Sequence, residues 1–456
     1  MQKEVKEKPR YAIVAAVQLP KVSDVEFESS LAELRDLAKT LGYEITATFT
    51  QKRSSFDATA YMGTGKREEM RAFVDSEPAA VPFEKMPQGA ADRNADPNAG
   101  TIDALFVDHE ISPSQARNLE KEVGCEVMDR TMVILEIFHR HATSRAARAQ
   151  VEIARLGYMA PRLREAAKLA GPQGRQRSGT GGRGAGESHT ELDKRKIRDH
   201  IAELQKEIIA MDLERKTQRA RRQDRKGGAN VALIGYTNAG KSTLMRALTG
   251  SDVLVENKLF ATLDTTVRAL QPESRPRVLV SDTVGFIKNL PHGLVASFKS
   301  TLEEALDASL LLHVIDASDP GFERQLAVTD KVLAEIGAQD VPRLRVFNKI
   351  DNAGSGDTAV QAEREAALRA VYRDCIVMSA RRSGDIALLR EAIVGFFRQD
   401  QIEAEIFLPW SEQQRRNDIF ASCEVLDERA DGDGAFLRIR GEPAAVTSLC
   451  EQFGRA

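Results

Sequence analysis

The sequence has few cysteines, few aromatic residues and no long apolar run. Its four cysteines are widely separated among 456 residues, so neither a disulfide framework nor a cysteine-rich metal site is expected. No segment approaches the ~18 consecutive apolar residues that a membrane-spanning helix needs, and residues 1–10 lack the apolar core of a secretory signal. These absences predict a cytoplasmic protein with no stable membrane insertion.

Charge is nearly balanced over the whole chain but unevenly distributed. The 65 Lys and Arg residues and 68 Asp and Glu residues leave a net charge of −3. Residues 139–226, however, contain 22 Lys and Arg against 11 Asp and Glu, so this stretch carries +11 and the remainder −14. Such clustering is typical of surfaces that bind nucleic-acid phosphates, and also of solvated helical faces. Charge alone leaves both readings open.

The pattern of apolar runs divides the chain into four predicted domains, within the two to four domains that its length allows. Residues 1–141 alternate strands with helices, which predicts a small α/β domain. Residues 142–226 predict a basic helical hairpin around a Gly-rich loop. Residues 227–400 repeat strand and helix, which favours an α/β domain with a mostly parallel sheet, and residues 401–456 predict a small α+β domain.

Each domain has specific expected elements. The first should contain helices at Ser30–Leu41 and Ser112–Val123 and an aperiodic loop at Ser76–Gly100, and its strands should be Tyr11–Val17, Tyr43–Thr50, Ile102–Val107 and Gly124–Met128. In the hairpin we expect a helix at Arg145–Leu156, a flexible loop at Gly171–Gly186, and a heptad seam through Ile197, Ile201, Leu204, Ile208 and Met211. The third domain should contain the strands Val231–Ile234, Arg277–Ser281, Ser309–Asp316, Leu344–Asn348 and Cys375–Ser379. The fourth should contain a strand, a helix, a hairpin and a last helix.

A phosphate-binding motif follows the first strand of the third domain. Gly235-Tyr-Thr-Asn-Ala-Gly-Lys-Ser242 matches G-x-x-x-x-G-K-[ST], the P-loop, and precedes a helical stretch. Its glycines allow the backbone N–H groups to surround phosphates near a helix N-terminus. Lys241 is expected to reach the β- and γ-phosphates, and the Ser242 hydroxyl to ligate Mg²⁺.

Three further motifs follow in the order found in GTPases. Asp282-Thr-Val-Gly285 ends a strand, where Asp282 is placed to hold Mg²⁺ through water and the Gly285 N–H to sense the γ-phosphate. Asn348-Lys-Ile-Asp351 offers a carboxylate that can pair with the N1–H and 2-amino groups of guanine but would stay unpaired against adenine. Ser379-Ala-Arg381 offers a backbone N–H to the guanine O6. Together these motifs predict a GTP-binding domain.

Two positions bear on hydrolysis. Phe286 follows Gly285, where Ras-like enzymes carry a glutamine that positions the attacking water, so intrinsic hydrolysis should be slow unless another group positions that water. Asn238 occupies a place in the loop at which translation-associated GTPases with asparagine can recruit K⁺. The alternative, that Asn238 only fills the loop, stays open.

The chain resembles the HflX family of ribosome-associated P-loop GTPases over about residues 10–400. The motifs that carry the resemblance are Asp108–Glu120, Asp129–Thr131, Ile134–Phe138, Gln150–Ala154, Gly235–Ser242, Leu259–Asp264 and Asp282–Ile287. Residues 76–100 and the hairpin segment Gly184–Glu191 depart from the family pattern. The resemblance implies GTP as substrate, Mg²⁺ as cofactor, and the large ribosomal subunit and its rRNA as partners, with no DNA and a monomeric chain. It also favours Thr262 as the second Mg²⁺ hydroxyl, which spacing alone does not distinguish from Thr265 and Thr266.

The predicted site therefore has three sets of residues. Lys241, Asn238 and Gly285 are the candidate catalytic residues, and Ser242 and Thr262, with Asp282 through water, are the candidate metal site. The candidate GTP-binding residues are Gly235, Tyr236, Thr237, Asn238, Ala239, Gly240, Lys241, Ser242, Phe260, Ala261, Thr262, Leu263, Asp264, Asp282, Thr283, Val284, Gly285, Asn348, Lys349, Ile350, Asp351, Ser379, Ala380 and Arg381.

Two other functional readings compete with a ribosome-directed GTPase. The first is a nucleotide-gated adaptor for a non-ribosomal partner, in which hydrolysis is incidental. The second is an RNA-remodelling ATPase that uses the N-terminal domain, where Gly63-Thr-Gly-Lys66 is a fragment of a phosphate loop and more typical of a turn.

Overall fold

The computed structural model describes residues 10–76, 101–169, 189–223, 229–250, 259–260, 265–288 and 304–453. The chain divides into two compact units. The first unit comprises Met1–Met211, Glu256–Asp264 and Lys288–Lys299, and the second comprises Asp212–Val255, Thr265–Ile287 and Ser300–Ala456. The predicted loops at 76–100 and 171–186 lie outside the described residues, apart from Ser76, and the division into four domains stays a prediction.

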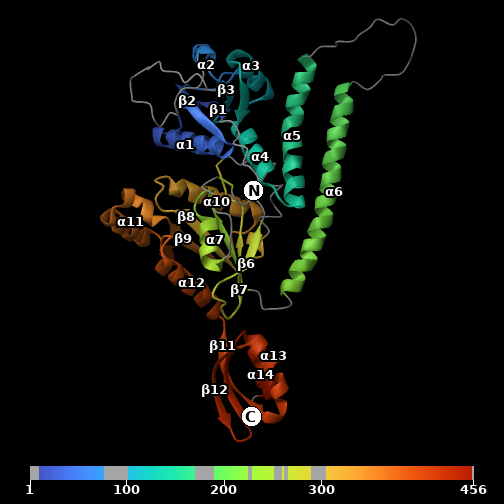
Figure 1. Ribbon diagram of the computed structural model, residues 1–456, viewed down its shortest axis with the longest axis vertical. Helices are drawn as coiled ribbons and strands as arrows, with labels where there is room; N and C mark the ends of the chain where they lie inside the picture. Colours follow the sequence, from blue (N-terminus) through green and yellow to red (C-terminus); the bar gives the residue numbers. More distant parts are fainter. Residues whose placement is uncertain are drawn as a thin grey trace, which may run out of the picture. The chain divides into compact units, whose positions relative to one another are not determined.

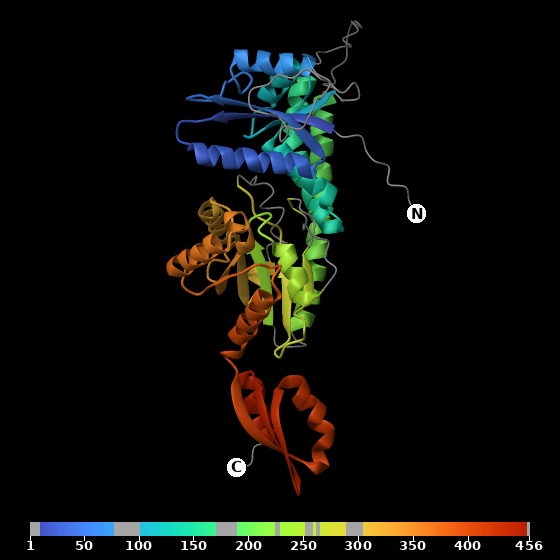
Figure 2. The same ribbon diagram turned by 60° about the vertical axis from the view of Figure 1, so that its left-hand side comes forward.

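The first unit is built on a four-stranded parallel sheet in the order β2-β1-β3-β4. Its strands are β1 (Arg10–Gln18), β2 (Tyr43–Lys52), β3 (Ile102–Val107) and β4 (Glu126–Asp129), as the sequence predicted to within a few residues. The helices are α1 (Asp24–Thr40), α2 (Thr64–Ser76), α3 (Pro113–Val123) and α4 (Arg130–His141). Helices α1 and α2 cover opposite faces of the sheet (Figure 2).

Local chemistry fixes the start and end of α3. The Ser112 hydroxyl accepts a hydrogen bond from the Gln115 backbone N–H, and the Gln115 side chain binds the Ser112 N–H in return, which forms a capping box. Pro113 occupies the first helical turn, where its missing N–H costs nothing. The helix ends at Gly124, whose φ of 92° suits glycine. The predicted helix at Ser112–Val123 is confirmed.

A long helical hairpin follows α4. It consists of α5 (Arg145–Leu169), which is longer than predicted, and α6 (His189–Gln223) (Figure 1). Arg145 at the start of α5 forms an ion pair of 3.2 Å with Glu207 of α6, as expected for antiparallel helices. The residues of the predicted heptad seam are half-buried, whereas Ile209 on another face of α6 is exposed.

The second unit contains a six-stranded sheet in the order β10-β9-β8-β5-β7-β6. Its strands are β5 (Ala229–Gly235), β6 (Thr266–Ala269), β7 (Val278–Asp282), β8 (Leu310–Asp316), β9 (Arg343–Asn348) and β10 (Cys375–Val377). All neighbours are parallel except β6 and β7. The five predicted strands are present. The sequence did not predict β6, because this short edge strand is only half-buried and lacks an apolar run.

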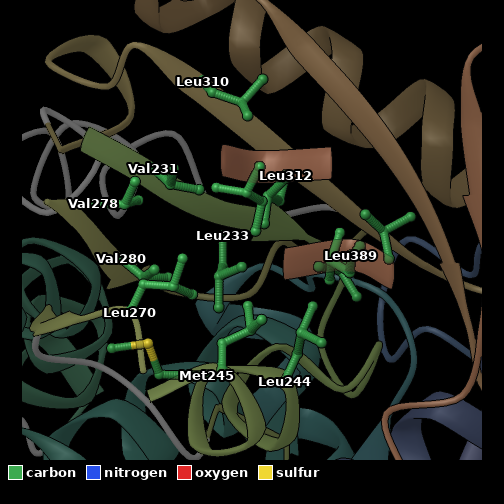
Figure 3. Close-up of a cluster of buried hydrophobic side chains, with 14 of the residues drawn as sticks. Val231, Leu233, Leu244, Met245, Leu270, Val278, Val280, Leu310, Leu312 and Leu389 are labelled. Atoms are coloured by element: carbon green, nitrogen blue, oxygen red, sulfur yellow. The ribbon is translucent and has the colours of Figure 1, made fainter. Parts of the chain in front are cut away.

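Helices cover both faces of this sheet. On one face, α7 (Lys241–Thr249) and α12 (Ser383–Arg398) pack Leu244, Met245 and Leu389 against side chains of β5, β7 and β8 (Figure 3). On the other face, α10 (Phe322–Ile336) and α11 (Thr358–Val371) pack in one apolar cluster with Ile315 of β8 and Phe347 of β9. Burial on both faces explains the nearly continuous apolar sequence of β8.

The last part of the second unit is an antiparallel sheet in the order β11-β13-β12 with two helices. Its elements are β11 (Ile402–Pro409), η3 (Trp410–Arg415), α13 (Arg416–Ser422), β12 (Glu424–Asp431), β13 (Gly434–Gly441) and α14 (Pro443–Phe453), in the predicted order. One sheet face joins the helices in an apolar core, and the other carries ion pairs such as that of Glu403 with Arg438 and Arg440. No helix in the described part of the chain is long and apolar enough to cross a membrane.

Candidate functional site

The predicted phosphate loop joins β5 to α7 and is held by close backbone packing. Gly235 and Gly240 have φ values of 143° and 95°, which side-chain-bearing residues rarely adopt. A Cβ atom on Gly235 would lie 2.2 Å from the Val314 carbonyl oxygen, and one on Gly240 would lie 2.3 Å from Asn348 Nδ2. The glycines of the motif are therefore required both by conformation and by space.

Lys241 begins α7 and lies inside this loop. Its side chain is 6% exposed, and Nζ donates hydrogen bonds to the carbonyl oxygens of Gly235 at 3.0 Å and Tyr236 at 2.7 Å. Burial lowers the pKa of Lys241 to about 8, against a smaller opposing effect of the Asp282 carboxylate. The loop thus holds a buried cation whose charge is only partly compensated, and a bound phosphate would supply the missing negative charge.

Ser242 and Asp282 form the pair that fits a magnesium ion. Asp282 is the last residue of β7, is completely buried, and accepts a hydrogen bond of 2.8 Å from the Ser242 hydroxyl to Oδ2. A hydroxyl and a carboxylate are hard oxygen donors, which Mg²⁺ prefers. Thr262 lies outside the described residues. Of the two alternatives, Thr266 begins β6 and pairs in register with Asp282, and Thr265 directly precedes that strand.

The segment after Asp282 runs alongside the phosphate loop. Tyr236 and Phe286 form an isolated parallel bridge, in which the Phe286 N–H donates to the Gly235 carbonyl at 3.1 Å and the Thr237 N–H to the Phe286 carbonyl at 2.7 Å. Gly285 fits tightly, since a Cβ atom there would lie 2.9 Å from Lys241 Nζ and equally close to Thr237. The predicted γ-phosphate sensor therefore lies beside the loop lysine.

Asn348 connects the phosphate loop to both predicted guanine motifs. Its Nδ2 donates to the Ala239 carbonyl at 3.0 Å, and its Oδ1 accepts from the Ala380 N–H at 2.9 Å. The side chain is 1% exposed, so both bonds are shielded from water. This one residue sets the spacing between the loop, the end of β9 and the segment after β10.

The guanine motifs themselves lie together at the carboxyl edge of the sheet. Lys349 has a left-handed conformation, with φ of 61°, and forms an ion pair of 2.8 Å with Asp316 at the end of β8. The Asp351 carboxylate is partly exposed, at 3.4 Å from the guanidinium of Arg381. The Ser379 N–H donates to Asp385 at 2.8 Å.

Two of these supporting residues were missed by the sequence analysis. Asp316 ends a strand and Asp385 lies in the first turn of α12, and strand ends and helix N-termini commonly carry such carboxylates. Neither belongs to a motif, so only position in the chain could have indicated them.

Part of the predicted switch segment belongs to the first unit. The Leu259 N–H donates to Thr40 Oγ1 at 3.2 Å, and the Phe260 ring packs on Phe138 with centroids 4.5 Å apart. Residues 261–264 lie outside the described residues. Contact of the segment with nucleotide stays a prediction.

Gly63–Lys66 of the first unit does not have the arrangement of a phosphate loop. Thr64 begins α2, the N–H of Lys66 donates to the Gly63 carbonyl, and the Lys66 ammonium forms an ion pair of 2.7 Å with Glu69. The preceding residues Asp57 and Tyr61 form an isolated bridge rather than the end of a sheet strand. These contacts form a helix start, and offer no support to a second nucleotide site here.

Buried ion pairs instead dominate the carboxyl edge of the first sheet. Arg130, at the start of α4, binds Asp108 at 2.9 Å and also Glu33. Asp129 caps α4 through the Met132 N–H and forms an ion pair of 2.6 Å with Arg162. The motifs Asp108–Glu120 and Asp129–Thr131 thus supply structural contacts.

Three protein-family models match the chain in succession. Residues 28–139 match a family described as GTP-binding GTPase N-terminal, residues 141–222 one described as GTP-binding GTPase Middle Region, and residues 230–349 one described as 50S ribosome-binding GTPase.

Curated relatives match almost the entire chain. A protein named GTPase HflX from Gluconacetobacter diazotrophicus is 51% identical over 451 residues, covering 96% of each chain. Another of that name, from Caldanaerobacter subterraneus subsp. tengcongensis, is 37% identical and covers 96% of this chain and 92% of its own. Among solved structures, a GDP complex of a GTP-binding protein from Sulfolobus solfataricus is 24% identical, with a TM-score of 0.43, and covers 85% of this chain and 99% of that chain.

Proposed function

Since the chain belongs to the HflX family of GTPases, we propose that it hydrolyses GTP at the Gly235–Ser242 loop and does so in association with the large ribosomal subunit. GTP binding and hydrolysis follow from family membership. The observation that supports the site most strongly is the pair of buried hydrogen bonds from Asn348, which joins the phosphate loop to the guanine motifs.

In this proposal the phosphates lie in the loop and the base lies against β9 and β10. Lys241 neutralises charge on the β- and γ-phosphates, and Gly285 senses the γ-phosphate. Ser242 and Thr262 would hold Mg²⁺ directly, and Asp282 would hold it through water. When bound, the ion withdraws charge from the phosphate oxygens. We propose that the remaining GTP-binding residues predicted from the sequence also contact the nucleotide.

Guanine selectivity tests the site directly. Asp351→Asn replaces the acceptor that pairs with the N1–H and 2-amino groups, so it should weaken GTP binding and raise the relative affinity for xanthosine triphosphate. Asp340→Asn, at an exposed carboxylate beside β9, is the matched control and should leave both affinities unchanged. Unchanged preference for GTP in Asp351→Asn would rule out the base site.

The ribosomal part of the proposal has two supports. The matched family model for residues 230–349 is described as a 50S ribosome-binding GTPase. The chain also concentrates a charge of +11 in residues 139–226, and an rRNA surface is a dense array of phosphates. We propose that this basic stretch contacts rRNA of the large subunit, and that the protein acts there as a cytoplasmic monomer.

Cosedimentation separates this proposal from an adaptor for another partner. The full chain, loaded with a non-hydrolysable GTP analogue, should sediment with purified large subunits and less so when loaded with GDP. Small subunits at equal concentration provide the control for nonspecific binding to RNA. Equal binding to both subunits in both nucleotide states would contradict the proposal.

Potassium is a further part of the proposed mechanism. Asn238 has a left-handed conformation, with φ of 58°, and its side chain is exposed at the loop surface. We propose that it helps to hold K⁺ beside the phosphates. GTP hydrolysis should then be faster in KCl than in NaCl of equal concentration, and Asn238→Ala should remove the difference. An equal rate in both salts would leave Asn238 as a loop residue only.

A further inference from the structure

The buried hydroxyl of Thr237 is unusual among the side chains around the phosphate loop. Thr237 is 6% exposed, and its Oγ1 atom has no hydrogen-bond partner among the residues that the structure describes. Leaving a buried hydroxyl unpaired costs about 1–3 kcal/mol, so such groups call for an explanation. The loop motif leaves this position open to any residue, and the motif therefore gives no reason for threonine here.

Neighbouring hydroxyls do not share this property. Ser242 Oγ donates to Asp282, and Thr283 Oγ1 donates to the Leu233 carbonyl at 2.7 Å. Ser281 Oγ likewise donates to the Val231 carbonyl at 3.2 Å. In contrast to these three groups, the Thr237 hydroxyl neither donates to nor accepts from any residue that the structure describes.

Thr237 also lies at the place where hydrolysis must occur. A Cβ atom on Gly285 would be 2.9 Å from Thr237 Cα, from Thr237 Cγ2 and from Lys241 Nζ, so the threonine, the γ-phosphate sensor and the phosphate-binding ammonium meet at one point. The Thr237 N–H is already used by the Phe286 carbonyl. The side-chain hydroxyl of Thr237 therefore keeps a hydrogen-bonding capacity that no described residue uses.

The residue that would ordinarily position water cannot do so. Phe286 is 1% exposed, and its backbone is paired on both sides with the loop. An apolar ring neither donates to nor accepts from water, whereas a hydroxyl can do both. Phe286, which cannot position water, and Thr237, whose hydroxyl has no partner among the described residues, lie on adjoining segments. The bridge between Tyr236 and Phe286 joins these segments.

We infer that Thr237 Oγ1 positions the water that attacks the γ-phosphate. In this step the water oxygen forms a bond to the γ-phosphorus, and the bond from that phosphorus to the β–γ bridging oxygen breaks, its electron pair leaving with GDP. The proton lost by the water passes to the inorganic phosphate or to solvent. The Thr237 hydroxyl accepts a hydrogen bond from the water. This bond orients the water so that a lone pair of its oxygen faces the γ-phosphorus. This inference rests on the proposed nucleotide site.

The test compares variants of the full chain at position 237. Thr237→Val keeps the shape and removes the hydroxyl, and it should lower kcat for GTP roughly 100-fold, in the range for a lost positioning group, while the Kd for GTP stays within about threefold. The Thr237→Ser and Thr237→Ala variants differ from each other only by the hydroxyl group. The serine variant should therefore retain most of the wild-type kcat, and the alanine variant should lose it. This second pair decides the question if valine impairs folding.

Two controls separate this inference from the site assignment. Thr249→Val removes a buried hydroxyl from α7, where it donates to Met245, and should leave hydrolysis unchanged. Lys241→Ala should abolish GTP binding if the site is assigned correctly, and normal binding in that variant would end the site proposal itself. If Lys241→Ala fails to bind while Thr237→Val hydrolyses GTP at the wild-type rate, the site stands and the inference about Thr237 is wrong. Equal losses in the serine and alanine variants would also overturn it, because packing of the methyl group would then explain the effect.

Discussion

Asn348 and Ala239 are joined by a hydrogen bond of 3.0 Å, in which the buried side-chain amide donates to a carbonyl of the phosphate loop. The same amide accepts from the Ala380 N–H through its oxygen. The segments that we propose to bind the phosphates and the base lie more than a hundred residues apart in the chain, and the Asn348 side chain bonds to both. A change at Asn348 must affect both.

We predict that Asn348→Ala weakens GTP binding roughly 10- to 100-fold. The substitution leaves the Ala239 carbonyl and the Ala380 N–H unpaired, at about 1–3 kcal/mol for each buried group. Isothermal calorimetry with GTP and GDP measures the loss. Asn352→Ala, four residues further along and exposed, is the control and should bind as the wild type does. Equal affinities in the two variants would show that Asn348 does not organise the site.

Lys241 predicts a specific pH dependence of GTP affinity. Burial lowers its pKa to about 8 in the nucleotide-free protein, whereas bound phosphates favour the charged form and raise that pKa. Below about pH 8 the lysine is already protonated, and affinity should be flat. Above it, GTP binding must take up a proton, so affinity should fall by up to about tenfold per pH unit.

The measurement is calorimetric titration between about pH 7 and 9 in buffers of different ionisation enthalpy, which reports the proton uptake directly. Guanine itself titrates toward the upper end of this range, so the contribution of Lys241 is taken from the proton uptake around pH 8. Proton release on binding, rather than uptake, would contradict the assignment.

The buried cation of the first unit predicts a stability effect. Arg130 binds both Asp108 and Glu33 and is 2% exposed. Arg130→Ala would remove the guanidinium that binds the buried Asp108 carboxylate and the half-buried Glu33 carboxylate, and we expect a loss of about 3–5 kcal/mol in local stability. Arg71→Ala breaks an exposed ion pair with Asp75 and should cost under about 1 kcal/mol. Hydrogen exchange of β1 and β3 in the full chain measures both, and equal protection in the two variants would be the contrary result.

The sequence predicted those features that are set by local chemistry. The phosphate loop was predicted directly, because two glycines with positive φ and a lysine at the start of a helix leave few possible backbone conformations. The capped start of α3 was equally readable from Ser112 and Pro113. Five strands of the larger sheet followed from their apolar runs.

The features that the sequence did not predict depend on contacts between distant segments. Strand β6 forms only because β7 offers it an edge, and its own four residues carry no strong signal. Asn348 belonged to a known motif, but its link to Ala239 requires the folded sheet. The unpaired hydroxyl of Thr237 is visible only once Gly285 and Phe286 are placed beside it.

The basic stretch predicts a steep salt dependence of binding to large subunits. If residues 139–226 neutralise rRNA phosphates, the logarithm of the binding constant should fall linearly with the logarithm of salt concentration, because bound counterions are released. Replacing Arg175, Arg177 and Arg183 of the Gly-rich loop by alanine should weaken binding and reduce the slope by roughly one unit for each lost contact. Because these three arginines belong to none of the nucleotide-binding motifs, the GTP affinity of the variant should equal that of the wild type.

A matched variant with Lys331, Arg369 and Arg373 replaced by alanine removes the same charge from exposed positions on α10, on α11 and just past α11. It should keep the wild-type slope, because net charge alone acts weakly beyond a Debye length of about 8 Å at physiological salt. GTP turnover stimulated by the subunit should fall in the loop variant and persist in the control. Parallel slopes for all three proteins, with equal stimulation, would show that the loop only connects α5 to α6 and that the excess of positive charge lies on a solvated helical surface.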